Sequence, residues 1–149
     1  MFRHILVPTD GTAFSSEAAD RAIELAAPIG GRVTFVHALP ARPLPFFGGE
    51  GGMFVEQVKP DEFEASARVA AAKHLAALEE KARAAGVQTG SVAQGGGEPY
   101  EVIIELATTL GCDLILMASH GHTGIKGLIL GSETQKVLTH TKIPVLVYR

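Results

Sequence analysis

The sequence predicts an α/β fold in which an open, five-stranded parallel sheet carries helices on both faces. Short β-branched segments alternate with longer segments of helical periodicity, in the order β-α-β-α-β-α-β-α-β. Strand segments such as ILV and DLILM are also apolar throughout, which is typical of parallel strands buried on both faces. Right-handed crossovers then leave few topologies.

The predicted elements follow one another with clear boundaries. Pro99 suits the first turn of the third helix, and the fourth helix is expected to begin at Ser132, where Gln135 completes a capping-box pattern. The strands are His4–Val7, Arg32–His37, Val87–Ala93, Asp113–Met117 and Pro144–Tyr148. The first three helices show apolar faces at Ala19, Ala22, Ile23 and Ala26, at Phe63, Ala67, Ala70, His74, Leu75 and Leu78, and at Ile103, Leu106, Ala107 and Leu110, and are expected to end at Gly30-Gly31, Gly86 and Gly111.

Residues 40–60 interrupt this rhythm with four prolines and four glycines. We interpret them as a flexible loop or lid whose Phe46, Phe47, Met53 and Phe54 cover a ligand or a partner. A surface excursion packed on the core is the alternative. No repeat or second domain is evident, so residues 1–149 are expected to form a single domain.

Composition excludes several classes of protein. The chain of 149 residues is 46% hydrophobic and 19% charged, which is typical of a globular domain. Its 13 Lys and Arg against 16 Asp and Glu give a net charge of −3, which argues against a nucleic-acid-binding protein. The single cysteine excludes an internal disulfide and favours a reducing compartment. With no apolar run of membrane-spanning length and no signal-peptide pattern, we expect no membrane insertion and a cytoplasmic location.

Ligands of open parallel sheets bind beyond the carboxyl ends of the strands, so the residues that follow strands are informative. The segment Pro8-Thr9-Asp10-Gly11 follows the first strand, and a segment from Ala118 to Gly124 follows the fourth. The latter leads to Gly131-Ser132 at a helix start, where backbone N–H groups and the helix dipole favour phosphate. Gly121 and Gly131 would let phosphate oxygens approach the backbone, and the Ser132 hydroxyl could help to hold Mg²⁺. Alternatively, Ser132 is only an N-cap and the glycines only form turns.

The chain resembles the universal stress protein family over nearly its whole length. The resemblance lies in ILVPTDGT, VTFVHAL, GEPYEVI, DLILMASHG and GSETQKVLTHTKIPVLV. The family's nucleotide motif, G-x2-G-x9-G-[S/T], is matched at Gly121, Gly131 and Ser132, whereas Ala118 replaces its first glycine. The added methyl group could weaken ATP binding without abolishing it.

The resemblance implies an adenine-nucleotide alpha-hydrolase-like fold with strand order 3-2-1-4-5, and binding of ATP, or of AMP or ADP, with Mg²⁺. Asp10 would then accept from ribose or adenine, although an Asp-Gly turn residue is the alternative. Glu133 would act only through its backbone, because its carboxylate repels phosphate. The nucleotide-binding residues so implied are Pro8, Thr9, Asp10, Ala38, Met117, Ala118, His120, Gly121, Gly131, Ser132, Glu133 and Thr134.

The resemblance also implies a homodimer through the closing strand IPVLV and a stress-response regulator that signals to an unknown protein partner. We expect a binding module and no catalytic residues. A slow ATPase or phosphotransferase is one alternative. A dimeric adaptor that has lost its nucleotide, which Ala118 alone would support, is the other.

Sequence patterns of other catalytic, cofactor or metal sites are weak or absent. The chain has no Walker A lysine motif, no G-x-G-x-x-G and no G-x-S-x-G. Cys112 is expected to be buried, and His37 and His74 to be packed. His120 and His122 are too few for a metal site. Lys126 either reaches a phosphate or is solvated, and His140 suits a helix C-terminus.

Overall fold

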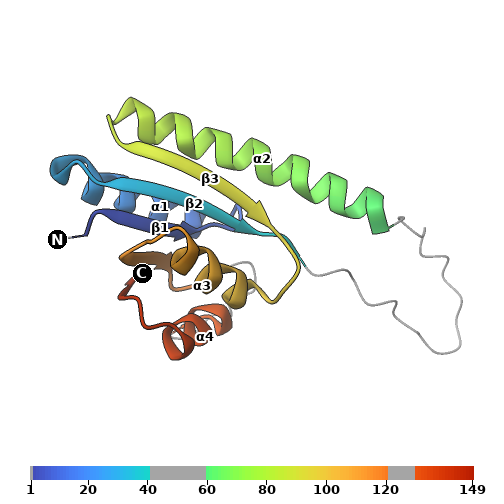
Figure 1. The fold of residues 1–149 in the computed structure, drawn as a ribbon. Helices are drawn as coiled ribbons and strands as arrows, with labels where there is room; N and C mark the ends of the chain where they lie inside the picture. The colour runs from blue at the N-terminus through green and yellow to red at the C-terminus, as the bar shows by residue number, and fades with distance from the viewer. Residues whose placement is uncertain (1, 41–59, 121–129) are drawn as a thin grey trace, which may run out of the picture.

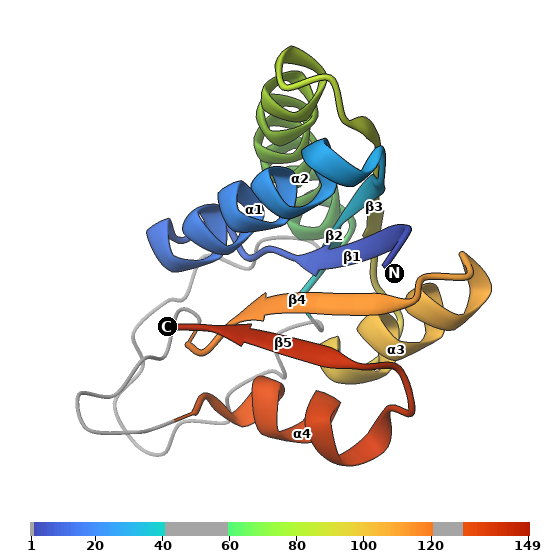
Figure 2. The ribbon, with the colours of Figure 1, turned by 90° about the vertical axis from the view of Figure 1, so that its left-hand side faces the viewer.

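The predicted sheet is confirmed in a computed structural model, which describes residues 2–40, 60–120 and 130–149. All five strands are parallel and lie in the order β3-β2-β1-β4-β5 (Figures 1 and 2). The strands are β1 (His4–Pro8), β2 (Arg32–Ala38), β3 (Gln88–Gln94), β4 (Leu114–Ala118) and β5 (Val145–Tyr148). The first two strands in the chain, β1 and β2, are neighbours, whereas β4 pairs on the other side of β1, so the strand order reverses beside β1.

The helices form two layers, one on each face of the sheet. Residues of α1 and α2 pack in the apolar core on one face, and residues of α3 and α4 pack in the core on the other. Figure 2 shows α1 above β1 and α4 below β5. The helices are α1 (Ala13–Ala26), α2 (Pro60–Ala84), α3 (Pro99–Thr109) and α4 (Ser132–His140), with a 3₁₀ turn at Ala27–Ile29. Within the described ranges, none of the helices combines the length and apolarity that crossing a bilayer requires.

Side chains of the central strands alternate between two apolar cores. Ile5 and Val7 of β1 pack with α1 and α2, whereas Leu6 between them packs with α3 and α4. In β4, Leu116 belongs to the first core and Met117 to the second. This double burial is the physical reason why these strands are apolar throughout.

Some predicted boundaries were wrong by one residue. The sequence placed Pro144 in the last strand, but β5 begins at Val145, and Pro144 only accepts a hydrogen bond from the Ile115 N–H at 2.9 Å. Similarly, β3 begins at Gln88 rather than Val87. Of the predicted loop at 40–60, residues 41–59 lie outside the described residues, and Pro60 already belongs to α2.

Candidate functional site

A cavity of about 410 Å³ opens where β1 and β4 end, beside the reversal of strand order. Its volume falls in the range of small-molecule sites, roughly 300–1,000 Å³. The structure brings together in its lining every predicted site residue except Gly121, which lies outside the described residues. They are Pro8, Thr9, Asp10, Ala38, Met117, Ala118, His120, Gly131, Ser132, Glu133 and Thr134.

One wall of the cavity is the turn that joins β1 to α1. The Asp10 Oδ1 atom accepts hydrogen bonds from the Thr12 backbone N–H at 3.0 Å and from the Thr12 hydroxyl at 2.6 Å. Gly11 has a φ of +81°, a conformation that L side chains rarely adopt. The Thr12 hydroxyl in turn accepts from the Ser15 N–H and caps α1. Asp10 therefore is an Asp-Gly turn residue, and it also lines the cavity.

Beneath this turn lies a polar network that connects three elements. The Thr9 hydroxyl lies 2.5 Å from His74 Nε2 of α2 and 3.1 Å from the Ser15 hydroxyl of α1. Thr9 and Ser15 are almost completely buried. The sequence predicted only packing for His74, and nothing in the sequence singled out Ser15.

The opposite wall is the amino end of α4, which is attached closely to the end of β4. The Gly131 N–H donates to the Ser119 carbonyl at 2.6 Å, and the Thr134 hydroxyl donates to the Ala118 carbonyl at 3.1 Å. A Cβ atom at Gly131 would lie 3.1 Å from the Ser119 oxygen, closer than most real contacts of this kind. Packing against the Ser119 carbonyl thus favours glycine at position 131, independently of any ligand.

The predicted capping box at Ser132 and Gln135 was wrong, although α4 does begin at Ser132. The N-cap is Gly131, in an extended conformation, and Ser132 is the exposed first residue of the helix. The Gln135 side chain instead donates to the Leu130 carbonyl at 3.1 Å. Ser132 is therefore not explained by capping, which was the alternative to a ligand-binding role. By helix geometry, the N–H groups of the first turn have no acceptor within the helix.

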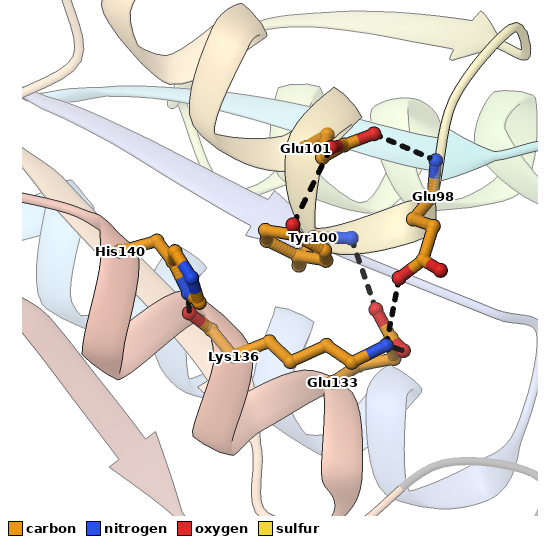
Figure 3. Close-up of polar contacts among 6 residues, drawn as sticks. All are labelled: Glu98, Tyr100, Glu101, Glu133, Lys136 and His140. Carbon is orange, nitrogen blue, oxygen red and sulfur yellow. Dashed lines mark hydrogen bonds and ion pairs between the residues drawn. The ribbon is translucent and has the colours of Figure 1, made fainter.

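Glu133 lines the cavity, but its carboxylate is bound to groups of the protein. Its Oε2 accepts from the Tyr100 backbone N–H of α3 at 3.0 Å, and its Oε1 is 3.2 Å from Lys136 Nζ (Figure 3). Lys136 also donates to Glu98 at 2.7 Å, and hydrogen bonds to Glu98 and Glu133 raise its pKa. Desolvation raises the pKa of Tyr100, and the neighbouring Glu101 carboxylate raises it further. The Glu133 carboxylate thus joins α4 to α3.

Apolar groups complete the cavity. Val36, Ile103 and Met117 belong to the core between the sheet, α3 and α4, so they present an apolar surface on that side. Ala118 belongs instead to the core on the α1 face, because side chains alternate along β4. Sequence reasoning missed Ser15, Val36, His37, Pro40, Pro99 and Ile103. Only Pro40 carried a usable signal, because it follows the second strand.

Two other predictions concern residues outside the cavity lining. Cys112 is buried, as expected, and desolvation raises the pKa of its thiol to about 11, which leaves it protonated and unreactive at neutral pH. A ring nitrogen of His140, Nδ1, lies 2.8 Å from the Lys136 carbonyl in the last turn of α4.

The predictions for Lys126 and His122 concern residues outside the described ranges. Among the residues that the structure describes, no three His, Cys, Asp or Glu side chains are grouped to hold a metal ion.

Comparisons with known proteins identify relatives of this chain over its whole length. The model of the universal stress protein family matches residues 1–149. Universal stress protein YxiE of Bacillus subtilis is 31% identical over 149 residues, with both chains covered completely. A universal stress protein of Thermus aquaticus is 32% identical over the same length and also covered completely.

Solved structures show the same fold. Protein MJ0577 of Methanocaldococcus jannaschii superposes with a TM-score of 0.82 at 25% identity, covering 99% of this chain and 95% of that one. A universal stress protein solved in complex with cAMP has a TM-score of 0.68, also at 25% identity, and is covered to 97%.

Proposed function

This chain belongs to the universal stress protein family, and from that premise we propose that it is an adenine-nucleotide-binding regulator of the stress response. The observation that carries the proposal is the cavity between the Asp10 turn and the amino end of α4. It offers a carboxylate acceptor on one wall, N–H donors of a helix start, which have no acceptor within the helix, on the other, and apolar groups between them. The relative in complex with cAMP supports an adenine nucleotide as the ligand.

Each wall suits a different part of the nucleotide. Adenine would lie against Met117 and the backbone of Ala38, since flat aromatic rings favour apolar walls. Asp10 would accept from the ribose hydroxyls, because a carboxylate repels phosphate. The phosphates would bind at the α4 amino end, among Gly131, Ser132 and Thr134, with His120 beside them. Gly121 remains a predicted member of this group.

ATP with Mg²⁺ is the proposed ligand, and AMP and ADP are alternatives. Phosphate oxygens would supply most of the ligands to the ion, because Mg²⁺ keeps several waters and uses few protein groups. The exposed Ser132 hydroxyl is the protein group suited to join them.

We propose binding rather than catalysis as the activity. Asp10 and Glu133, two carboxylates in the cavity lining, are already bound to Thr12 and to Tyr100 and Lys136. A general base must reach the proton that it removes. Both oxygens of Glu133 are engaged by α3 and Lys136, and Asp10 is assigned to the ribose hydroxyls, so neither is placed to act as the base. The bound nucleotide would instead alter a surface recognised by a partner protein.

The proposal also includes a single domain that acts in the cytoplasm as a homodimer. The single cysteine favours the cytoplasm. The position of β5 at the edge of the sheet, with its apolar sequence VLVY, favours pairing with a second copy.

The test is the identity of whatever small molecule copurifies with the protein. The chain has no Trp and two Tyr, so a bound adenine would dominate its ultraviolet spectrum. We expect acid extraction and mass analysis to yield an adenine nucleotide, and calorimetry with Mg-ATP to show binding to the stripped protein. Extraction without nucleotide, together with no heat up to millimolar Mg-ATP, AMP and ADP, would refute the proposal.

A substitution at Ala118 tests the alternative that the protein is a dimeric adaptor that has lost its nucleotide. Its side chain lies in the core on the α1 face, so we expect Ala118→Gly to leave the affinity for Mg-ATP unchanged. An affinity that appears only in the glycine variant would favour the adaptor.

A further inference from the structure

The hydrogen bond between His74 and Thr9 connects helix α2 to the proposed nucleotide site across 65 positions of sequence. Thr9 lies directly before Asp10 and lines the cavity. Its backbone N–H donates to the Val36 carbonyl of β2 at 2.8 Å, and its hydroxyl lies 2.5 Å from His74 Nε2. Thr9 is therefore held by two elements that do not flank it in the chain.

The number of available protons determines which group donates in each hydrogen bond between His74, Thr9 and Ser15. Three contacts follow one another: His74 Nε2 to Thr9 Oγ1, Thr9 Oγ1 to Ser15 Oγ at 3.1 Å, and Ser15 Oγ to the Thr12 carbonyl at 3.0 Å. Each hydroxyl has one proton to donate. All three contacts carry a proton only when His74 Nε2–H donates to Thr9, Thr9 to Ser15, and Ser15 to the carbonyl.

The same two hydroxyls also hold the backbone of the turn. Thr9 Oγ1 lies 3.4 Å from the Gly11 N–H, and Ser15 Oγ lies 3.4 Å from the Asp10 N–H, each as an acceptor. Thr9 and Ser15 are only 5% and 4% exposed, so replacing a lost donor with water requires a rearrangement. Loss of the His74 donor would thus loosen the turn that carries Asp10.

We propose that His74 is a positioning residue of the nucleotide site, which acts through Thr9 to hold the Asp10 turn in place. The inference rests on the proposed function, because it assumes that this turn contacts the nucleotide. It also makes α2 part of the site: a displacement of this helix at His74 would change the nucleotide affinity, and by reciprocity the nucleotide would stabilise the contact.

The experiment measures AMP binding by calorimetry in variants of the full chain. His74→Leu removes the donor, whereas His74→Gln keeps an N–H group near the position of Nε2. Lys73→Leu, at an exposed neighbouring position on α2, is the control for changes in the helix itself. We expect about a three- to tenfold loss of affinity in His74→Leu, the usual effect of one lost hydrogen bond, and little loss in the other two. Circular dichroism and thermal unfolding verify that each variant is folded.

A double-mutant cycle with Thr9→Val separates positioning from a general structural effect. If His74 acts through the Thr9 hydroxyl, adding His74→Leu to Thr9→Val costs no further affinity. Equal losses in both backgrounds, or a His74→Leu protein that binds AMP as the wild type does, would overturn the inference and leave the proposed function intact. A wild-type protein that binds no adenine nucleotide overturns both.

Discussion

At the scale of single residues, Gly131 shows how packing and ligand binding can demand the same amino acid. The sequence suggested that its missing Cβ makes room for phosphate. In the structure, the space that a Cβ would need is taken by the Ser119 carbonyl, 3.1 Å away. A glycine in a binding motif can thus serve the fold first, and its presence alone does not demonstrate a ligand.

Gly131→Ala should therefore destabilise the protein even without nucleotide. We expect a loss of about 1–2 kcal/mol in the free energy of unfolding, measured with urea, because the backbone must shift to relieve the contact. Gly95→Ala is the matched control, since its Cβ would meet Leu39 at an ordinary 3.5 Å. Equal stability of the two variants would show that α4 adjusts freely.

His4 gives a prediction for pH. Its Nε2 lies 2.8 Å from the Thr34 hydroxyl, and desolvation, followed by the nearby Arg32 charge, lowers its pKa below the ordinary 6.5. The neutral form is favoured in the folded state, so stability falls as pH drops from 6.5 toward the lowered pKa. Urea midpoints at pH 7 and pH 5 should therefore differ less in His4→Gln than in the wild type, and an equal difference would show that His4 contributes nothing.

At the scale of elements, α3 and α4 stabilise each other through one carboxylate. Glu133 of α4 accepts from the N–H of Tyr100, in the first turn of α3 (Figure 3). It thereby satisfies one of the donors that a helix start leaves unbonded. The sequence predicted both helices but not this contact, because it depends on how the two helices lie in space.

Glu133→Ala should cost about 1 kcal/mol of unfolding free energy, which is typical of a lost cap. Glu133→Gln should recover part of that loss, since its amide oxygen still accepts. Lys136→Met, which removes the exposed ion pairs with Glu98 and Glu133, should cost less, because such pairs contribute little in water. A larger effect of Lys136→Met than of Glu133→Ala would reverse this assignment.

The sequence predicted the helices and strands better than it predicted how α4 is capped. Apolar periodicity predicted α1, α2 and α3, and short β-branched segments predicted the five strands that the structure describes, because burial on the two faces of a sheet dictates these patterns. The start of α4 was predicted from a local capping pattern instead. Ser132 and Gln135 fit a capping pattern in which Ser132 is the N-cap. The N-cap is instead Gly131, whose N–H donates to the Ser119 carbonyl. Local patterns fail where a distant strand fixes the start of a helix.

At the scale of the whole molecule, the topology explains why the residues predicted from two distant segments lie together. Residues after β1 and β4 are more than a hundred positions apart in the chain, yet pairing of these strands brings their ends together. The predicted residues of both segments therefore meet in one cavity. Ser15, Ile103 and His74 could not be found in this way, because they come from helices whose positions above the strand ends the sequence does not reveal.

The edge strand β5 gives a prediction for the proposed homodimer. Leu146 is 41% exposed on β5, and Leu138 is equally exposed on α4. We expect Leu146→Lys to shift the protein toward monomer in sedimentation equilibrium, and Leu138→Lys to leave the dimer intact, because only the first charge lies on the edge strand. A wild-type monomer, or equal effects of the two variants, would exclude this interface.

The most direct test of the central claim compares AMP binding to Asp10→Asn and Asp20→Asn by calorimetry. Asp10 lines the cavity, whereas Asp20 is bound to Lys81 on the outside of α1. The Asp10→Asn amide oxygen still accepts from Thr12, so the turn should remain while the charged acceptor for ribose is lost. We predict one AMP bound per wild-type chain, unchanged affinity in Asp20→Asn, and about tenfold weaker binding in Asp10→Asn. Equal affinities in the two variants would contradict the account.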